Sequence, residues 1–349
     1  MNLKQYYVGK IPFYFILLFL YMGCKSAGSN SLVQQAESDF TIAFGSCNKS
    51  SLSNPLWDDI VSARPDVWIW GGDIIYADTD NRKKLREMYM DQDNVAGYAL
   101  LKTKMPVIGT WDDHDYGLND GGVEFKGKKW SQQEFLDFMD VPVDSPRRTR
   151  EGVYSSHDYT VPVGSIKIIV LDTRYFRTAL TPDKDTKKRH KPNVYGQGTV
   201  LGMEQWAWLK DELNFSKADF NIIVSSIQFL SNEHGFECWG NFPHEVDQLK
   251  SLIASSKAKG VVLLSGDRHI SEFSRTKVDG LAYPLIDFTS SGLTHVYSSF
   301  SGEPNPFRVG AVVSKKSFGL LDFDFNKKKV RFKMVGDHGV LLGELEQNY

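Results

Sequence analysis

Cysteine is scarce in this chain, which has three in 349 residues, and once Cys24 is set aside only Cys47 and Cys238 are left to form a disulfide. Neither sign of charge dominates, because 41 Lys and Arg stand against 43 Asp and Glu. A nucleic-acid surface, which needs a basic excess, is therefore not evident. Low-complexity tracts and internal repeats are also missing. Hydrophobic residues make up 41% and aromatic residues 13% of the chain, enough for a large core.

The N-terminal segment differs from the rest of the chain. Two lysines precede the apolar stretch 11–23, which at about 13 residues is shorter than the roughly 20 that a membrane span needs. This pattern is typical of an export signal, and the small residue before Cys24 resembles a bacterial lipoprotein cleavage box. A plain signal peptide or signal anchor, with Cys24 incidental, stays open. We expect a signal over 1–24, a polar flexible tether over 25–37 and a single domain over 38–349.

From residue 38 onward, short apolar runs alternate with helical patterns, which predicts an α/β core. Beyond residue 283 the pattern becomes hairpin-like and predicts additional antiparallel strands. The predicted strands of the core are 39–47, 66–73, 105–113, 165–174, 219–228 and 260–269. The predicted helices are 54–63, 81–103, 201–216 and 244–255.

Potential metal ligands follow almost every predicted strand of the core. In an α/β sheet, ligands bind beyond the carboxyl ends of the strands, so neighbouring strand ends would place these side chains in one crevice. Carboxylates that lie close together repel one another unless cations are bound among them, and the simplest account is a centre with more than one metal ion. The side chains are Cys47, Asp73, Asp112, Asp113, His114, Asp172, Asp267 and His269.

Six motifs carry a family resemblance: "FGSCN", "GGDIIYAD", "WDDHDYGLND", "LDTRYFR", "GNFPHE" and "LSGDRHISE". Together, and in this order over about residues 40–300, they resemble the alkaline phosphatase D-like metallophosphatases. The resemblance implies a four-layer α/β sandwich of two mixed β-sheets flanked by helices. It also implies hydrolysis of phosphate esters at iron (Fe³⁺) with calcium or another divalent ion. Longer members carry an N-terminal β-domain, which we do not expect here because only the tether precedes residue 38.

The predicted metal ligands differ in how well each fits a ligand role, and several have an alternative role. Asp73 is the best candidate to bridge two ions about 3.5–4 Å apart, with a helix N-cap as the alternative. Tyr76 matches the "GDxxY" pattern of iron-containing purple phosphatases and is otherwise a half-buried aromatic. Cys47 is a thiolate ligand suited to iron, a buried apolar residue, or half of a disulfide with Cys238. The further predicted ligands are Asp113, Asn119, Asp267 and His269.

The motif "DDHD" offers catalytic roles as well. Asp112 or Asp113 is expected to bind metal, and His114 either donates a proton to the leaving oxygen or supports a carboxylate. Arg174 is a candidate for bidentate phosphate binding, with an ion pair to an acid as the alternative. Asp172, in the same motif as Arg174, is expected to be structural.

A long loop after the strand 219–228 is the expected place for substrate contacts. It contributes Trp239, Asn241 and His244, for which covering the core and starting a helix are the alternatives. The segment 182–192 is expected to be a charged, solvated flap. No partner pattern supports a role for the remaining histidines, namely His157, His190, His234, His295 and His338.

The sequence therefore predicts an exported, metal-dependent phosphoesterase that works by attack of a metal-bound hydroxide, with alkaline phosphatase or phosphodiesterase activity. We expect it in the bacterial periplasm or as a cell-surface or outer-membrane lipoprotein, acting on a small-molecule or lipid phosphate ester. Action on lipid or teichoic-type diesters is the alternative within this class. A non-catalytic calcium-binding surface lipoprotein is the alternative from another class, although a structural calcium site prefers oxygens to thiolate and imidazole.

Overall fold

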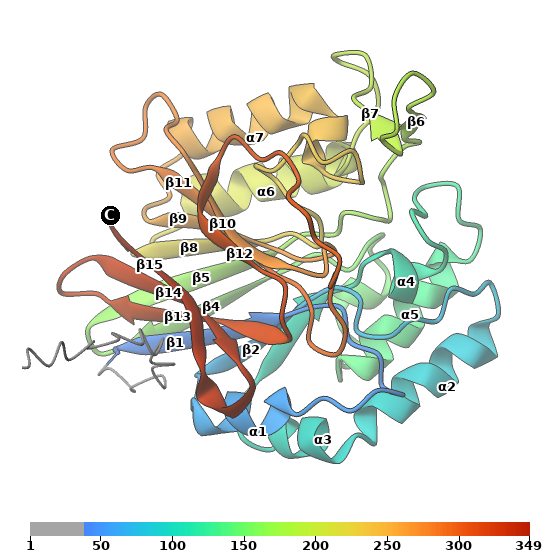
Figure 1. The fold of residues 1–349 in the computed structure, drawn as a ribbon, viewed down its shortest axis with the longest axis horizontal. Helices are drawn as coiled ribbons and strands as arrows, with labels where there is room; N and C mark the ends of the chain where they lie inside the picture. Colours follow the sequence, from blue (N-terminus) through green and yellow to red (C-terminus); the bar gives the residue numbers. More distant parts are fainter. Residues whose placement is uncertain (1–37) are drawn as a thin grey trace, which may run out of the picture. The chain divides into compact units, whose positions relative to one another are not determined.

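The structure is a computed structural model that describes residues 38–349, so the predicted signal over 1–24 and tether over 25–37 lie outside the described residues. Two β-sheets lie face to face, and helices cover the outer face of each (Figure 1). The predicted α/β sandwich of two mixed sheets flanked by helices is confirmed. None of the helices between residues 38 and 349 is long and apolar enough to cross a membrane.

The first sheet has six strands in the order β15-β14-β13-β1-β2-β3. β1, β2 and β3 are parallel to one another, whereas β13, β14 and β15 form the antiparallel meander that the C-terminal pattern predicts. The bounds are β1 Phe40–Gly45, β2 Val67–Gly71, β3 Val107–Thr110, β13 Ser317–Asp324, β14 Lys329–Gly336 and β15 Leu341–Asn348.

The second sheet has seven strands in the order β12-β10-β11-β9-β8-β5-β4. Its centre, β11-β9-β8-β5, is parallel, and antiparallel strands lie on both sides. The bounds are β4 Ser155–Val161, β5 Gly164–Val170, β8 Phe220–Val224, β9 Val261–Ser265, β10 Ser271–Thr276, β11 Leu285–Ser290 and β12 Arg308–Val313. The short ribbon of β6 Thr181–Pro182 and β7 His190–Lys191 overlaps the predicted flap 182–192.

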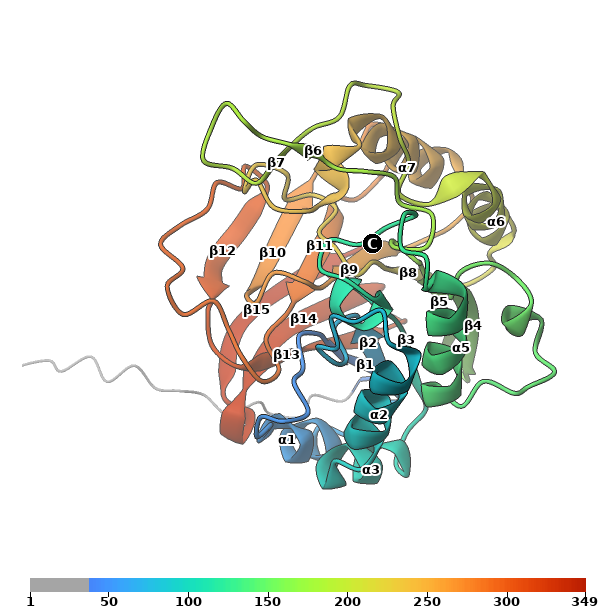
Figure 2. The same ribbon diagram turned by 90° about the vertical axis from the view of Figure 1, so that its right-hand side faces the viewer.

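The helices divide between the two outer faces. α1 Leu56–Ser62, α2 Arg82–Asp93, α3 Ala96–Lys102 and α5 Lys128–Phe138 cover the first sheet, and α6 Gly202–Phe215 and α7 Pro243–Ser255 cover the second (Figures 1 and 2). One difference from expectation is that 81–103 forms two helices, because Val95 takes an extended conformation (φ −65°, ψ 114°). The short helices are α4 Asp113–Tyr116, η1 Pro146–Arg148, η2 Trp239–Asn241 and η3 Asp337–Gly339.

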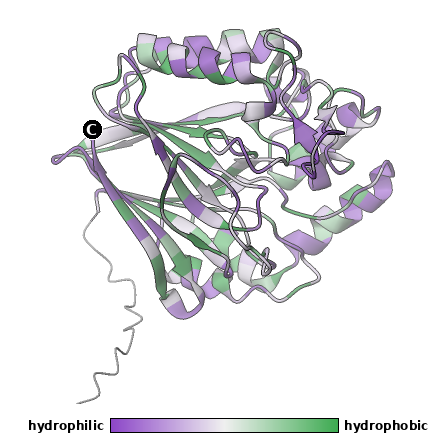
Figure 3. Ribbon diagram, turned by 45° about the horizontal axis from the view of Figure 1, so that its top comes forward, coloured by the Kyte–Doolittle hydropathy of each residue, from purple (hydrophilic) through white to green (hydrophobic). Residues whose placement is uncertain are grey.

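The central strands of both sheets contribute apolar side chains to the core between the sheets and to the cores under the helices. Figure 3 shows hydrophobic residues along these strands. In β2, Val67 and Ile69 contribute to the core between the sheets, while Trp68 and Trp70 pack against the helices. Trp57 of α1 meets both tryptophans edge to face, with ring centroids 5.7 Å apart in each case. A strand buried on both faces needs a continuous apolar run, which is why the sequence reads VWIW without alternation.

The carboxyl ends of the parallel strands meet along one edge of the sandwich. Paired residues such as Gly45 with Trp70 and Gly71 with Thr110 show that β1, β2 and β3 end nearly level. In the second sheet, Val170 pairs with Val224, and β11 runs parallel to β9. The connections after these strands therefore come together in one place, and α4 lies among them (Figure 1).

Candidate metal centre

Four of the predicted metal ligands have a left-handed backbone conformation. The φ angles are 58° at Cys47, 52° at Asp73, 68° at Asp267 and 56° at His269. L-residues rarely adopt this conformation, and residues that do so cluster at functional sites where the surroundings hold them in place. The sharp turn directly after each strand directs these side chains into the space between the sheet ends.

Two glycines let the turns approach one another closely. A Cβ at Gly72, which has φ +93°, would lie 2.6 Å from the Cβ of Asp112. A Cβ at Gly266 would lie 2.5 Å from the carbonyl oxygen of Gly71. Because no larger residue fits at either position, the glycines of "GGD" and "SGD" bring the acidic side chains together.

The first group of converging side chains combines sulfur, oxygen and nitrogen donors. The Sγ of Cys47 lies 3.3 Å from Oδ2 of Asp73, and Tyr76 donates its hydroxyl to the same oxygen at 3.0 Å. The Tyr76 hydroxyl is also 3.4 Å from Nε2 of His269. Thiolate, phenolate, imidazole and carboxylate together suit a transition metal such as iron better than calcium.

The second group consists of carboxylates. Asp73, Asp112, Asp113 and Asp267 each offer an oxygen, and these oxygens lie within 4.8 Å of one another. Asp73 belongs to both groups, as expected of a bridging ligand. Among the described residues, Oδ1 of Asp73 and Oδ1 of Asp113 are buried without a hydrogen-bond partner. A buried anionic oxygen without a partner is costly, so these residues fit a site for more than one cation.

The electrostatics of the cluster lead to the same conclusion. Burial, together with the charges of Cys47 and Asp113, raises the pKa of Asp73 well above its usual value. Burial also raises the pKa of Asp267 to about 6 and that of the Cys47 thiol to about 11, and in each case a neighbouring carboxylate adds to the increase. The protein alone therefore disfavours the anionic forms, and bound cations would reverse that preference.

His114 lies at the edge of the cluster, against Tyr76. Its Nδ1 is 2.7 Å from Oδ1 of Asp78, and its Nε2 is 4.0 Å from Oδ1 of Asp113. Burial alone would lower the pKa of His114, but the hydrogen bond to Asp78 and the charges of Asp73 and Asp113 outweigh it and raise the pKa to about 10. The geometry is compatible with both predicted roles, proton donor and supporting partner.

Asn119 is the predicted metal ligand that the structure does not bring into the cluster. It is exposed, and its side-chain amide donates to Oδ1 of Asp120 at 2.9 Å. The loop is nevertheless tied to the centre, since the backbone N–H of Asp120 donates to Oδ2 of Asp113 at 2.6 Å. A role for Asn119 as a ligand stays a prediction.

Arg174 is fully buried between two acids. Its Nε lies 2.5 Å from Oδ1 of Asp112, and its Nη1 lies 2.5 Å from Oε2 of Glu237. These contacts favour the ion-pair alternative over phosphate binding. They involve Oδ1 of Asp112, whereas its Oδ2 is buried without a hydrogen-bond partner among the described residues, so Asp112 and Asp113 both stay ligand candidates. Asp172 accepts hydrogen bonds from Trp111 and from several backbone N–H groups, as the expected structural role requires.

The three predicted substrate contacts of the long loop are held by other interactions. Trp239 is fully buried and donates its indole N–H to the hydroxyl of Ser225 at 3.0 Å. The Asn241 side chain accepts from the backbone N–H of Cys238 at 2.9 Å. His244, in the first turn of α7, has Nε2 at 3.2 Å from the carbonyl oxygen of Gly198. These contacts favour the structural alternatives, while substrate binding by these residues stays a prediction.

The two cysteines of the described chain do not form a disulfide with each other. Cys47 and Cys238 are both free and fully buried, and only Cys47 lies among the clustered acids. Of the three interpretations of Cys47, the disulfide with Cys238 is therefore not formed, and the contact with Asp73 favours the ligand.

Sequence reasoning missed a group of residues that follow β11. The hydroxyl of Ser291 lies 3.0 Å from Sγ of Cys47 and accepts the backbone N–H of His269 at 2.7 Å. The imidazole of His295 packs against the rings of His269 and Tyr76, with centroids 4.5 Å and 4.9 Å apart. The expectation that ligands follow the ends of parallel strands would have identified Ser291 and His295. However, β11 lies in the region that the sequence pattern predicted to be hairpin-like.

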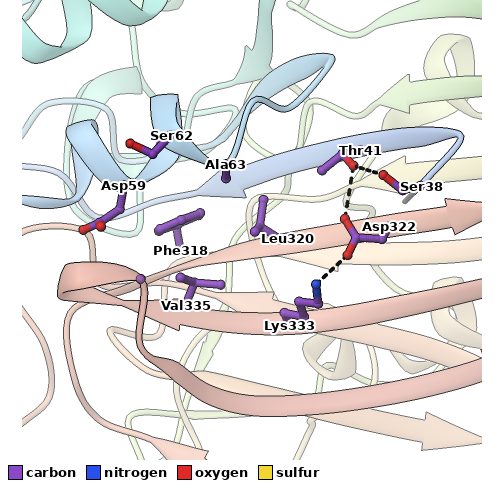
Figure 4. A pocket seen from close by; sticks show the side chains of 11 residues that line it. Ser38, Thr41, Asp59, Ser62, Ala63, Phe318, Leu320, Asp322, Lys333 and Val335 are labelled. Atoms are coloured by element: carbon purple, nitrogen blue, oxygen red, sulfur yellow. Dashed lines mark hydrogen bonds and ion pairs between the residues drawn. The ribbon is translucent and has the colours of Figure 1, made fainter. Parts of the chain in front are cut away.

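A cavity of about 650 Å³ opens beside the centre, large enough for a small substrate. Its lining includes side chains of the first ligand group and the His114–Asp78 pair. The lining residues that matter for the argument are Lys49, Tyr76, Asp78, His114, His269 and His295. A second cavity, of about 190 Å³, lies between α1 and the outer face of the first sheet, where Lys333 pairs with Asp322 (Figure 4).

Two facing mixed sheets, helices on both outer faces and a cluster of potential metal ligands at the strand ends are the features of the metallophosphatase class. The chain belongs to the PhoD-like phosphatase family, which it matches over residues 79–305, more than half of its length. This is a family of metal-dependent phosphoric-ester hydrolases. Cys47, Asp73 and Tyr76 lie outside the matched residues, so their assignment rests on the structure and on the motifs.

Individual relatives agree with this assignment. The chain is 26% identical over 220 residues to alkaline phosphatase D of Bacillus subtilis (strain 168), an alignment that covers 57% of this chain and 36% of the relative. The match thus spans about a third of the curated relative.

Solved structures share the fold. One described as the structure of PhoD superposes with a TM-score of 0.70 at 19% identity, covering 88% of this chain and 68% of the other. A dimetal phosphatase from Danio rerio has a TM-score of 0.51 at 14% identity, covering 90% of this chain and all of the other. At these identities the likeness concerns the fold.

Proposed function

We propose that this protein hydrolyses phosphate esters at a centre of at least two metal ions. The observation that carries the proposal is Asp73, whose carboxylate belongs to both groups of ligand atoms and keeps one buried oxygen without a partner. A carboxylate placed in this way can hold two cations at the short spacing that suits phosphoryl transfer.

The donor chemistry supports two different ions. Cys47, Tyr76 and His269 would hold iron, and the carboxylates of Asp113 and Asp267 would hold calcium or another divalent ion. When bound, the ions would neutralise the charge of the phosphoryl oxygens and activate the attacking water.

In this proposal the residues of the chain have separate roles in binding the ester and in proton transfer. The ester enters the cavity with its phosphoryl group toward Asp73 and its leaving group toward the opening. Asp78 binds Nδ1 of His114 at 2.7 Å, which leaves Nε2 free to donate a proton to the departing oxygen. No serine or histidine nucleophile is required, because water attacks phosphorus directly.

The test combines metal analysis with an aryl-phosphate assay. The wild-type protein is expected to contain bound metal and to release nitrophenol from p-nitrophenyl phosphate. Asp73→Asn is expected to lower turnover by a factor of about 100 or more and to lower the metal content, while the circular dichroism stays unchanged. The matched control Asp144→Asn, at an exposed position, keeps wild-type behaviour. Wild-type turnover in Asp73→Asn contradicts the assignment.

We further propose that the protein is exported and anchored to the bacterial envelope through Cys24, where it meets a small-molecule or lipid phosphate ester. The support is the apolar stretch before Cys24 in the sequence. Labelling of cells with a fatty-acid analogue is expected to mark the wild-type protein and not Cys24→Ser. An unlabelled, soluble wild-type protein with its mature N-terminus elsewhere overturns this proposal.

A further inference from the structure

Lys49 is the one lysine or arginine, among residues 38–349, whose side chain lines the cavity beside the metal centre. Its neighbours in the lining include Asp78, Asp91 and three histidines. A lysine in a cavity next to a candidate phosphoryl-transfer centre is placed to contact an anionic group of the substrate.

The backbone holds Lys49 firmly in this position. Its N–H donates to Oγ1 of Thr294 at 2.8 Å. The preceding residue, Asn48, is buried and donates its amide to Gln92 at 2.6 Å and to the carbonyl oxygen of Ile74 at 3.0 Å. The residue before that is Cys47 of the centre itself. The side chain of Lys49 therefore starts from an ordered base two residues from a predicted metal ligand.

The ammonium group of Lys49 lies toward the centre. Its Nζ is 4.7 Å from the ring centroid of Tyr76, whose hydroxyl contacts Asp73 and His269. Within the described chain, no carboxylate forms an ion pair with Lys49, whereas the nearby cations Arg174 and Arg177 are both paired with Glu237. The ammonium group of Lys49 thus has no carboxylate partner in the described chain, whereas the charges of both buried arginines are already compensated by Glu237.

We propose that Lys49 binds a non-bridging oxygen of the substrate phosphoryl group and thereby gives the enzyme a preference for phosphomonoesters over phosphodiesters. This inference rests on the proposed function. A monoester carries two negative charges at alkaline pH and a diester carries one, so a fixed ammonium stabilises the monoester more strongly. The exposed carboxylates of Asp78 and Asp91 line the same cavity and disfavour a leaving group that adds further negative charge.

The experiment compares Lys49→Met, Lys49→Arg and the control Lys104→Met, an exposed lysine that does not line the cavity. Steady-state kinetics with p-nitrophenyl phosphate and bis(p-nitrophenyl) phosphate give the ratio of kcat/KM for the two substrates. Calorimetric titration with inorganic phosphate gives the Kd of each metal-loaded protein without turnover. Thermal unfolding and metal analysis check that each variant is folded and loaded.

Lys49→Met is expected to lower the monoester-to-diester ratio about tenfold and to weaken phosphate binding by a similar factor. Lys49→Arg keeps both values within about threefold, because the charge remains, and Lys104→Met matches the wild type. An unchanged ratio and an unchanged phosphate Kd in a loaded Lys49→Met protein overturn the inference while leaving the proposed function standing. A wild-type protein that turns over neither ester refutes the proposed function instead, and the phosphate titration then still decides whether Lys49 binds the anion.

Discussion

At the residue scale, Ser291 is a neutral side chain placed to support the candidate metal centre. Its oxygen accepts the N–H of His269, so its own hydrogen is free to be donated to Sγ of Cys47, 3.0 Å away. A hydrogen bond to a sulfur ligand orients the sulfur and reduces its negative charge density, as supporting contacts of metal sites commonly do.

Ser291→Ala is expected to weaken metal retention about tenfold, measured as the rate of metal loss to a chelator. The matched control is Ser290→Ala, because the buried hydroxyl of Ser290 has no hydrogen-bond partner within the described residues. Equal rates of metal loss from the two variants would remove Ser291 from the support of the centre.

The two buried thiols lend themselves to a paired substitution. Cys47→Ser is expected to lower metal content and to reduce activity at least about tenfold, since serine is a poor replacement for a thiolate ligand. Cys238→Ser is expected to change neither, because the structure places Cys238 outside the groups of ligand atoms. Thiol titration of the denatured, unreduced protein checks the redox state and is expected to find both cysteines reduced. A disulfide between them would contradict the structure.

At the scale of single elements, strand β4 carries a histidine that should make folding sensitive to acid. Burial, with a contribution from the charge of Arg147, lowers the pKa of His157 from 6.5 to about 4. The unfolded chain therefore binds this proton at a higher pH than the folded chain does. The contribution of His157 to the free energy of unfolding has its full value above pH 6.5 and is lost progressively as the pH falls toward 4.

The expected contribution is on the order of 2 kcal/mol between pH 7 and pH 5. Replacing His157 with Asn should remove this part of the pH dependence, as measured by urea unfolding at both pH values. The control His338→Asn, at a highly exposed position, should leave the pH dependence of the wild type in place. An identical loss of stability in His157→Asn and the wild type would assign the acid sensitivity to other groups.

At the scale of the whole molecule, the centre joins the two sheets, because Cys47 and Asp73 follow strands of the first sheet and Asp267 and His269 follow a strand of the second. Cations bound there should stabilise the sandwich, since they bind the folded state and not the unfolded chain. Removing the metal with a chelator is expected to lower the Tm by about 5 °C or more.

The Asp73→Asn variant provides the comparison for this experiment. With its metal affinity already reduced, its Tm should change much less on chelation than that of the wild type. Differential scanning fluorimetry measures both proteins with and without added metal. A wild-type Tm that does not change on chelation would show that bound metal does not contribute to the stability of the sandwich.

The sequence by itself determined the class of fold, the parallel strands of the core and five candidate ligands. It did not predict β4, β10, β12 or α5. Cys47, Asp73, Asp113, Asp267 and His269 could be named as candidates because each lies within four residues of the end of a short apolar strand. In a parallel sheet those strand ends share one edge, and this local rule needs no knowledge of which strands are neighbours.

Only the tertiary structure decided the partners of the remaining residues. It placed β11 parallel to β9, which brings Ser291 and His295 to the centre, and it enclosed Arg174 between Asp112 and Glu237. The physical reason is that a side chain's partner depends on contacts between segments far apart in the chain. Asp112 and Arg174 are 62 residues apart, and Cys47 and Ser291 are 244 residues apart. Local sequence patterns do not predict such contacts, because the contacts form only when the strands pair and the sheets pack.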